Sequence, residues 1–212
     1  MQPHEDWQRQ IFRASRLDEF RAYLSGEMWN GDEYTSAEFI KRLTSYEESP
    51  AMAAGTAVHA VIERAAFGEL PRETDMNGWH IVMDLDAEIA MPEFREVPLF
   101  REHKGIPLFG RCDAIDANAV HDLKTTSQID IDRYMDSYQW RAYLYMSGRR
   151  NFVYDILRVK LEEDIKVVTV LDYTPIRVSA YPALSSDVER LLEQYDECVR
   201  ALGIPELLKV AA

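Results

Sequence analysis

The sequence predicts an α/β fold in which a central mixed β-sheet is flanked by helices. Apolar residues recur at helical spacing in the first third of the chain, alternate with polar residues through the middle, and show both patterns again in the last third. The chain has 212 residues, 47% hydrophobic and 29% charged, and no internal repeat or linker-like tract divides it. We therefore expect a single domain over residues 1–212, with N-terminal helices over about residues 1–68 and the sheet with its helices over about residues 78–202.

Three helices are predicted in the N-terminal part. Ser15 can cap a helix over residues 15–24, and Ser36 can cap a second helix over residues 36–43. A third helix is expected over residues 51–67, because its apolar residues fall on one side at helical spacing.

The middle of the chain predicts strands. Alternating apolar and polar residues, separated by turn signals such as Lys104-Gly105, favour antiparallel hairpins. A helix that stops at Gly148 is expected next, then two further strands and a closing helix. The expected strands cover residues 79–85, 94–102, 107–115, 120–125, 152–161 and 166–178, and the two helices cover residues 131–148 and 183–202.

Composition excludes several classes of protein. Two cysteines, Cys112 and Cys198, are too few for a disulfide framework or a four-cysteine iron–sulfur cluster. The net charge of −13 disfavours broad adhesion to nucleic acid or anionic lipid, although a local basic groove remains possible. No apolar run is long enough for a transmembrane helix, and the first residues show no secretory signal. We expect a soluble protein of the cytoplasm of a bacterium or of a phage-infected host.

The segment from Gly110 to Thr126 is the richest in chemistry. Asp113 ends one predicted strand, and Asp122 and Lys124 lie two residues apart on the next, so they project from the same face. Asp113 could lie opposite them across the hairpin. Two carboxylates and one ammonium on one face suit metal-assisted phosphodiester hydrolysis, because carboxylates hold Mg²⁺ or Mn²⁺ and the lysine can orient water or offset developing charge. A surface pair of Asp122 and Lys124 is the alternative.

Two helices add candidate side chains. His59 and Glu63 are four residues apart on one helix face, where they could reach a metal or a phosphate; a core histidine beside an exposed glutamate is the plain alternative. Gln139 and Tyr143 are also four residues apart, and could hydrogen-bond a phosphate or a base, although an aromatic stripe usually packs in a core.

Taken together, four ordered segments resemble the PD-(D/E)XK nuclease superfamily, RecB-like branch. They are Gly-Thr-x-x-His at 55–59, Gly-x-x-Asp at 110–113, Asp-Leu-Lys-Thr at 122–125 and Gln-x-x-x-Tyr at 139–143. The resemblance implies a restriction-endonuclease-like core, with Lys124 as the catalytic lysine beside the catalytic carboxylates Asp113 and Asp122. It implies metal ligation by His59, Asp113, Asp122 and the backbone carbonyl of Leu123, auxiliary acids at Glu96 or Glu63, and positioning of DNA by Gln139, Tyr143 and Tyr138.

The resemblance also implies an activity. A stand-alone chain of this type is similar to the phage recombination exonucleases of the lambda and RecE types, which implies a Mg²⁺- or Mn²⁺-dependent DNA exonuclease without an iron–sulfur cluster. It would act on duplex ends in phage-type recombination or DNA repair, as a ring-shaped homo-oligomer. A single-strand annealing protein is an expected partner. Candidate lining residues of a basic channel are Arg111, Arg133, Arg141, Arg149 and Arg150. A structure-specific or nicking endonuclease, and a non-catalytic interaction module that keeps the scaffold, are the alternatives.

Overall fold

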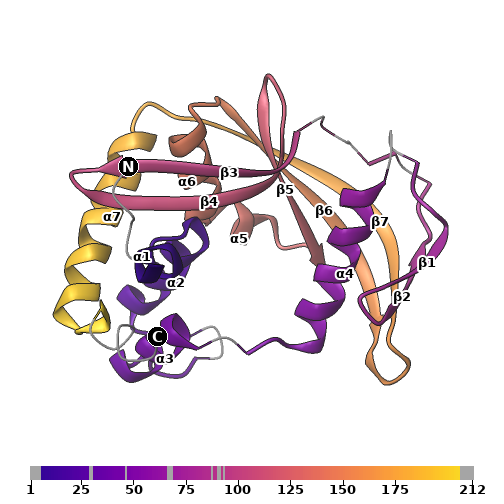
Figure 1. Cartoon of the computed structure of the whole chain (residues 1–212), viewed down its shortest axis with the longest axis horizontal. Helices are drawn as coiled ribbons and strands as arrows, with labels where there is room; N and C mark the ends of the chain where they lie inside the picture. The colour runs from indigo at the N-terminus through magenta and orange to yellow at the C-terminus, as the bar shows by residue number, and fades with distance from the viewer. Residues whose placement is uncertain are drawn as a thin grey trace.

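A mixed β-sheet organises the chain, and helices cover both of its faces (Figure 1). The computed structural model describes residues 6–28, 31–45, 47–65, 69–86, 88–89, 92 and 94–205. Within them the sheet has seven strands in the order β1-β2-β7-β6-β5-β4-β3. The strands are β1 (Glu73–Met76), β2 (Trp79–Met83), β3 (Phe94–His103), β4 (Ile106–Ile115), β5 (Ala119–Thr126), β6 (Asn151–Glu162) and β7 (Val167–Ser179). The α/β class predicted from the sequence is confirmed.

The helices form two groups. They are α1 (Asp6–Ile11), α2 (Ala14–Ser25), α3 (Ser36–Thr44), α4 (Pro50–Arg64), α5 (Ile131–Asp136), α6 (Tyr138–Ser147) and α7 (Leu184–Ala201), with a 3-10 turn at Glu163–Ile165. Along β5, Val120 belongs to the apolar core formed with α2, α6 and α7, whereas Leu123 belongs to the core formed with α4. Because side chains alternate along a strand, these two cores lie on opposite faces of the sheet. Figure 1 shows α4 beside β1 and β2, and the other group of helices beside β3 and β4.

Strand pairing confirms some predicted hairpins and corrects others. β3 pairs with β4, and β4 pairs with β5, both antiparallel as predicted. β2 also forms an antiparallel hairpin, but with β1, which was not predicted, and its other neighbour is β7, to which it is parallel. The buried residues of β2 pack with Val168 and Val170 of β7 against α4, a contact that the local pattern did not reveal.

The N-terminal helices differ from the sequence predictions at three of their ends. The N-cap of α3 is Thr35, whose hydroxyl accepts from the N–H of Glu38, and Ser36 is already helical. At the start of α2 the N-cap position is Arg13, not Ser15, and no side chain caps it. α4 ends at Arg64, with Ala65 as its C-cap, while residues 66–67 of the predicted helix lie outside the described residues.

The predicted helix over residues 131–148 is two helices. Ser137 interrupts it with extended backbone and then caps α6, so that α5 ends at Asp136. Gly148 ends α6 in the left-handed conformation, as predicted. Within the described ranges, no helix combines the length and the apolar character that crossing a membrane requires.

Candidate active site

The candidate site lies where β4 and β5 separate. Their ladder contains two residue pairs, Ala114 with His121 and Ile115 with Val120. Asp113 and Asp122 are the residues next to the Ala114–His121 pair, on the side away from the turn that joins the two strands. Beyond this pair a side chain links the two strands: Oδ2 of Asp113 accepts a hydrogen bond from the backbone N–H of Leu123 at 2.5 Å. In a strand the N–H and the carbonyl of one residue point to the same neighbour, so the Leu123 carbonyl faces the Asp113 side.

Asp122 and Lys124 form a close ion pair. Nζ of Lys124 lies 2.5 Å from Oδ2 of Asp122, as expected for residues that share a strand face. Asp122 is 3% exposed, and its Oδ2 has no hydrogen-bond partner of acceptable geometry among the described residues. Burial raises the pKa of Asp122, and the Lys124 ammonium opposes that rise. The Lys124 ammonium is in contact with this oxygen, so it offsets part of the cost of burying the carboxylate.

α4 brings an imidazole and a second acid to Asp113. Ser49 caps the helix by accepting from the N–H of Met52. Gly55 lets the helix approach β5, since a Cβ there would lie 2.7 Å from Oγ1 of Thr125. One turn later, Nδ1 of His59 lies 3.7 Å from Oδ1 of Asp113. Burial would raise the pKa of Asp113, but His59 and the Leu123 N–H together lower it, so the carboxylate is ionised.

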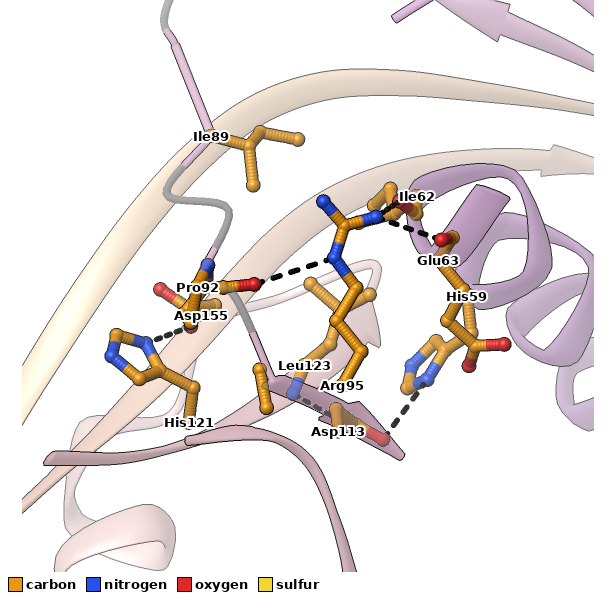
Figure 2. A pocket seen from close by; sticks show the side chains of 11 residues that line it. His59, Ile62, Glu63, Ile89, Pro92, Arg95, Asp113, His121, Leu123 and Asp155 are labelled. Carbon is orange, nitrogen blue, oxygen red and sulfur yellow. Dashed lines mark hydrogen bonds and ion pairs between the residues drawn. The ribbon is translucent and has the colours of Figure 1, made fainter. Parts of the chain in front are cut away.

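Three side chains gather closely enough to hold one cation. Ligand atoms of His59, Glu63 and Asp113 all lie within 4.8 Å of one another (Figure 2). An imidazole with two carboxylates is a donor set that suits Mn²⁺, and carboxylate oxygens suit Mg²⁺. Glu63, rather than Asp122, completes this cluster, although Asp122 lies close enough for its charge to act on Asp113 and His59.

Burial and a third acid, Glu96, raise the pKa of Glu63. Burial, then a hydrogen bond and the charge of Glu96, raises the pKa of Glu63 to about 7. Glu96 lies on β3 in the left-handed region, with φ 52°, and accepts from Arg111 at 2.7 Å. A non-glycine residue in this conformation is strained, and such strain often accompanies functional sites. Because Glu96 hydrogen-bonds Glu63, it lies beside the cluster.

A second polar group borders the same cavity, and the sequence analysis missed it. Nδ1 of His121 lies 2.8 Å from Oδ2 of Asp155, and the Tyr173 hydroxyl donates to Oδ1 of Asp155 at 2.6 Å. Both His121 and Asp155 are buried, and both line the cavity with His59, Asp113 and Arg95 (Figure 2). The one signal in the sequence was a lone acid, Asp155, within an apolar strand, where an unpaired charge is expensive.

The α6 residues serve two structural roles that the motif did not predict. Tyr143 is 5% exposed, and its hydroxyl donates to the Arg111 carbonyl at 2.8 Å. Its ring fills the space over Gly110, where a Cβ would lie 2.5 Å from a ring carbon. The Gln139 amide lies 3.5 Å from the Tyr143 hydroxyl, so the motif pair is in contact. Tyr143 therefore holds the backbone at Arg111, and it lines an open cavity together with Gly110 and Arg111.

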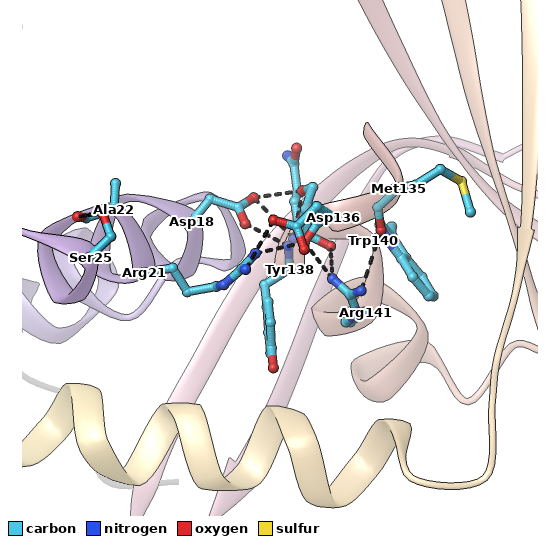
Figure 3. Close-up of polar contacts among 11 residues, drawn as sticks. Asp18, Arg21, Ala22, Ser25, Met135, Asp136, Tyr138, Trp140 and Arg141 are labelled. Atoms are coloured by element: carbon cyan, nitrogen blue, oxygen red, sulfur yellow. Dashed lines mark hydrogen bonds and ion pairs between the residues drawn. The ribbon is translucent and has the colours of Figure 1, made fainter. Parts of the chain in front are cut away.

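Tyr138 lies within a network that fixes the start of α6 (Figure 3). Asp18 of α2 accepts the Tyr138 N–H and the Ser137 hydroxyl. The Tyr138 ring lies between two guanidinium groups, with centroid distances of 5.0 Å to Arg21 and 4.8 Å to Arg141.

Several arginines considered for a basic channel are already engaged. Arg141 donates to the carbonyls of Asp136 and Ser137, Arg149 donates to the Asp116 carbonyl, and Arg111 pairs with Glu96. Arg133 and Arg150 are exposed. The basic channel therefore stays a prediction.

Comparison with known proteins defines the fold. No protein-family model matches the sequence, and no curated protein is significantly similar to it. Among solved structures, the alkaline exonuclease LHK-Exo from Laribacter hongkongensis is 19% identical and matches with TM-score 0.51 over 98% of both chains. The same enzyme in complex with dAMP matches with TM-score 0.53 at 17% identity over 98% of both chains. A Eubacterium rectale protein, provisionally assigned as an exonuclease, matches with TM-score 0.52 at 12% identity, over 93% of this chain and 83% of its own. The chain has the fold of these proteins.

Proposed function

We propose that this protein is a Mg²⁺- or Mn²⁺-dependent DNA exonuclease of the PD-(D/E)XK superfamily. The observation that carries the proposal is the meeting of the Asp122–Lys124 ion pair with the His59, Glu63 and Asp113 cluster, on elements far apart in the sequence. The fold shared with LHK-Exo supports the same reading. Since unpaired buried charges destabilise a fold, such a gathering of acids around one lysine calls for a cation and an anionic substrate.

His59, Glu63 and Asp113 would hold the cation, with Asp122 and the Leu123 carbonyl as further ligands. The donor set fits a hard or borderline divalent cation, and the buried Asp122 carboxylate, already paired with Lys124, would add an oxygen to it. When bound, a divalent cation supplies Lewis-acid activation of a phosphate and lowers the pKa of a water molecule.

Lys124 has the protonation state that phosphodiester hydrolysis needs. Burial would lower the pKa of Lys124, but the Asp122 carboxylate raises it above its usual value, so the amine is charged at neutral pH. A charged amine that is 30% exposed can orient the attacking water and offset negative charge on the phosphate. Asp122 holds Nζ in place for this task.

Gln139 and Tyr138 remain proposed contacts for DNA. Tyr143 is proposed to position Gln139, whose amide lies 3.5 Å from the Tyr143 hydroxyl. We further propose a single catalytic domain, action at duplex ends in recombination or repair, and a ring of several copies that focuses the few basic residues on the substrate. Focusing is needed because the net charge of −13 opposes binding to DNA.

The test compares two lysine variants on linear duplex DNA. Lys124→Ala is expected to lower the cleavage rate at least about 100-fold, because the charge nearest the phosphate is lost, while Mn²⁺ binding measured by calorimetry persists. Lys160→Ala is the matched control, since Lys160 lies on β6, is 61% exposed and also pairs with an acid, Glu162. Equal cleavage by Lys124→Ala and wild type would refute the proposed site.

A further inference from the structure

The C-terminal end of α4 is held by one arginine of β3. Nη1 of Arg95 donates to the carbonyls of Glu63 and Ala65, both at 2.7 Å, and approaches that of Ile62 at 3.3 Å. The last carbonyls of a helix lack partners within the helix, and the helix dipole places negative charge there. The Arg95 guanidinium satisfies both needs, and Figure 2 shows it between the helix end and the cavity.

Arg95 thereby joins the two elements that carry the metal-binding cluster. Its bonds hold the backbone of Glu63, whose side chain belongs to the cluster. Its own backbone pairs with Ala114, the residue after Asp113, on β4. The next residue on β3, Glu96, hydrogen-bonds the Glu63 carboxyl. The last turn of α4 is therefore fastened to β3 through both its backbone and its acid, at the level of Asp113.

We propose that Arg95 is the positioning residue of the metal site. Without the Arg95 guanidinium, the carbonyls of Glu63 and Ala65 would lose these bonds to Nη1, and the last turn of α4 could move away from β3. The ligand atoms of His59 and Glu63 would then no longer stay within reach of Asp113. The inference rests on the proposed function, since it assigns to Arg95 an effect on the affinity for a divalent cation. Arg95 would act on the metal site through α4, because its guanidinium donates to backbone carbonyls of that helix end.

The experiment measures Mn²⁺ affinity by calorimetry in three full-length variants. Arg95→Met keeps most of the stem and removes the guanidinium, and Arg95→Lys keeps the charge on one nitrogen but loses the planar group that bonds both α4 and Pro92. Arg101→Met is the matched control, because Arg101 lies on the same strand and donates to the Tyr145 carbonyl at 2.6 Å, away from the cluster. Thermal unfolding, and amide hydrogen exchange in the last turn of α4, accompany each titration.

Arg95→Met is expected to weaken Mn²⁺ binding at least about 10-fold, as changes to groups that support metal ligands commonly do. Amide exchange in the last turn of α4 should become faster, Arg95→Lys should recover part of the affinity, and Arg101→Met should bind like wild type. If Arg95→Met does not fold, Arg95→Lys decides: weaker Mn²⁺ binding by the folded variant supports the proposal.

Wild-type affinity in folded Arg95→Met, or in folded Arg95→Lys when Arg95→Met does not fold, would overturn the proposal. So would failure of both variants to fold, because Arg95 would then serve the whole fold rather than the site. Equal weakening in Arg101→Met would overturn it as well. If the wild type binds no Mn²⁺, the proposed function itself fails, and this inference fails with it; the two failures are told apart by the wild-type titration.

Discussion

At the scale of single residues, the protonation of Glu63 links the site to pH. Its pKa of about 7 lies above its ordinary value of 4.5, so the folded protein favours the neutral acid. A raised pKa stabilises the fold fully below the ordinary value, and that contribution is lost as pH rises through the folded value. The relevant window therefore runs from about pH 4.5 to about pH 7.

The prediction concerns metal-free protein. In EDTA, wild type should lose more of its unfolding free energy between about pH 5 and about pH 8 than Glu63→Gln does, because the amide stays neutral beside Glu96. Urea unfolding at several pH values measures the difference. Glu48→Gln, at an exposed glutamate, is the control and should follow wild type. If the unfolding free energy of Glu63→Gln depends on pH as strongly as that of wild type, Glu63 does not cause this pH dependence.

Residue-level prediction from the sequence succeeded where spacing alone fixes geometry. Asp122 and Lys124 had to share a strand face, and their atoms meet. Arg95 was not predicted, because its role depends on the end of α4 reaching β3, a contact between segments about 30 residues apart that no local pattern encodes. Helix spacing predicted that His59 and Glu63 could reach one metal, and the resemblance made Glu63 an auxiliary acid; the geometry places Glu63 in the cluster with His59 and Asp113.

At the scale of elements, the contact of α4 with β5 sets the distance between the helix ligands and the strand acids. Gly55 permits this contact, because a Cβ there would lie 2.7 Å from Oγ1 of Thr125. In a helix, alanine is otherwise more favourable than glycine by about 1 kcal/mol. The balance between propensity and crowding can therefore be measured at one position.

Gly55→Ala is expected to destabilise the protein by about 1 kcal/mol or more, since crowding in a packed interface outweighs the gain in helix propensity. In a Thr125→Ala background the same change should stabilise it by up to about 1 kcal/mol, because the clashing oxygen is gone. Urea unfolding of the four proteins of this double-mutant cycle gives both values. The same effect of Gly55→Ala in both backgrounds would contradict the contact.

Elements were predicted well where the pattern was long and regular, and poorly where tertiary contacts decide. The strand now labelled β5 and the stop at Gly148 needed no knowledge of neighbours. The break at Ser137 did, because Asp18 of α2 accepts the N–H of Tyr138 and so starts α6 anew. The hairpin of β2 with β1 is local, but its parallel pairing with β7 joins segments far apart in the chain, which no local pattern predicts.

At the scale of the whole molecule, one sheet separates two apolar cores, and each contains a tryptophan. Trp140 is buried in the core with α2, α6 and α7, and Trp79 in the core with α4. If the chain is the single domain that we propose, the strands that contribute to both cores should make them unfold together.

The prediction is one coincident unfolding transition. The chain has four tryptophans, so Trp7 and Trp29 are first replaced by Phe. In that background Trp79→Phe and Trp140→Phe each leave one indole, and their fluorescence reports on opposite faces of the sheet. Each variant should show fluorescence and far-ultraviolet circular dichroism transitions at the same urea concentration. Separated transitions within one variant would show that the two faces unfold as independent units.

Net charge and fold together restrict how the protein can act on DNA. With a net charge of −13, the proposed exonuclease cannot rely on general electrostatic attraction to the DNA duplex. A site that takes up the free end of the DNA is one way to hold the substrate. Dependence on a free end is therefore the property that separates the proposed exonuclease from an endonuclease of the same fold.

The most direct test incubates wild type and Lys124→Ala with linear and with covalently closed circular duplex DNA, each in Mg²⁺, Mn²⁺ or EDTA. We predict that wild type degrades linear DNA in Mg²⁺ or Mn²⁺, leaves the circle intact, and does nothing in EDTA, while Lys124→Ala is inactive throughout. Cutting of the closed circle would make the protein an endonuclease. Cleavage of neither DNA by wild type, or undiminished cleavage by Lys124→Ala, would contradict the account of this site.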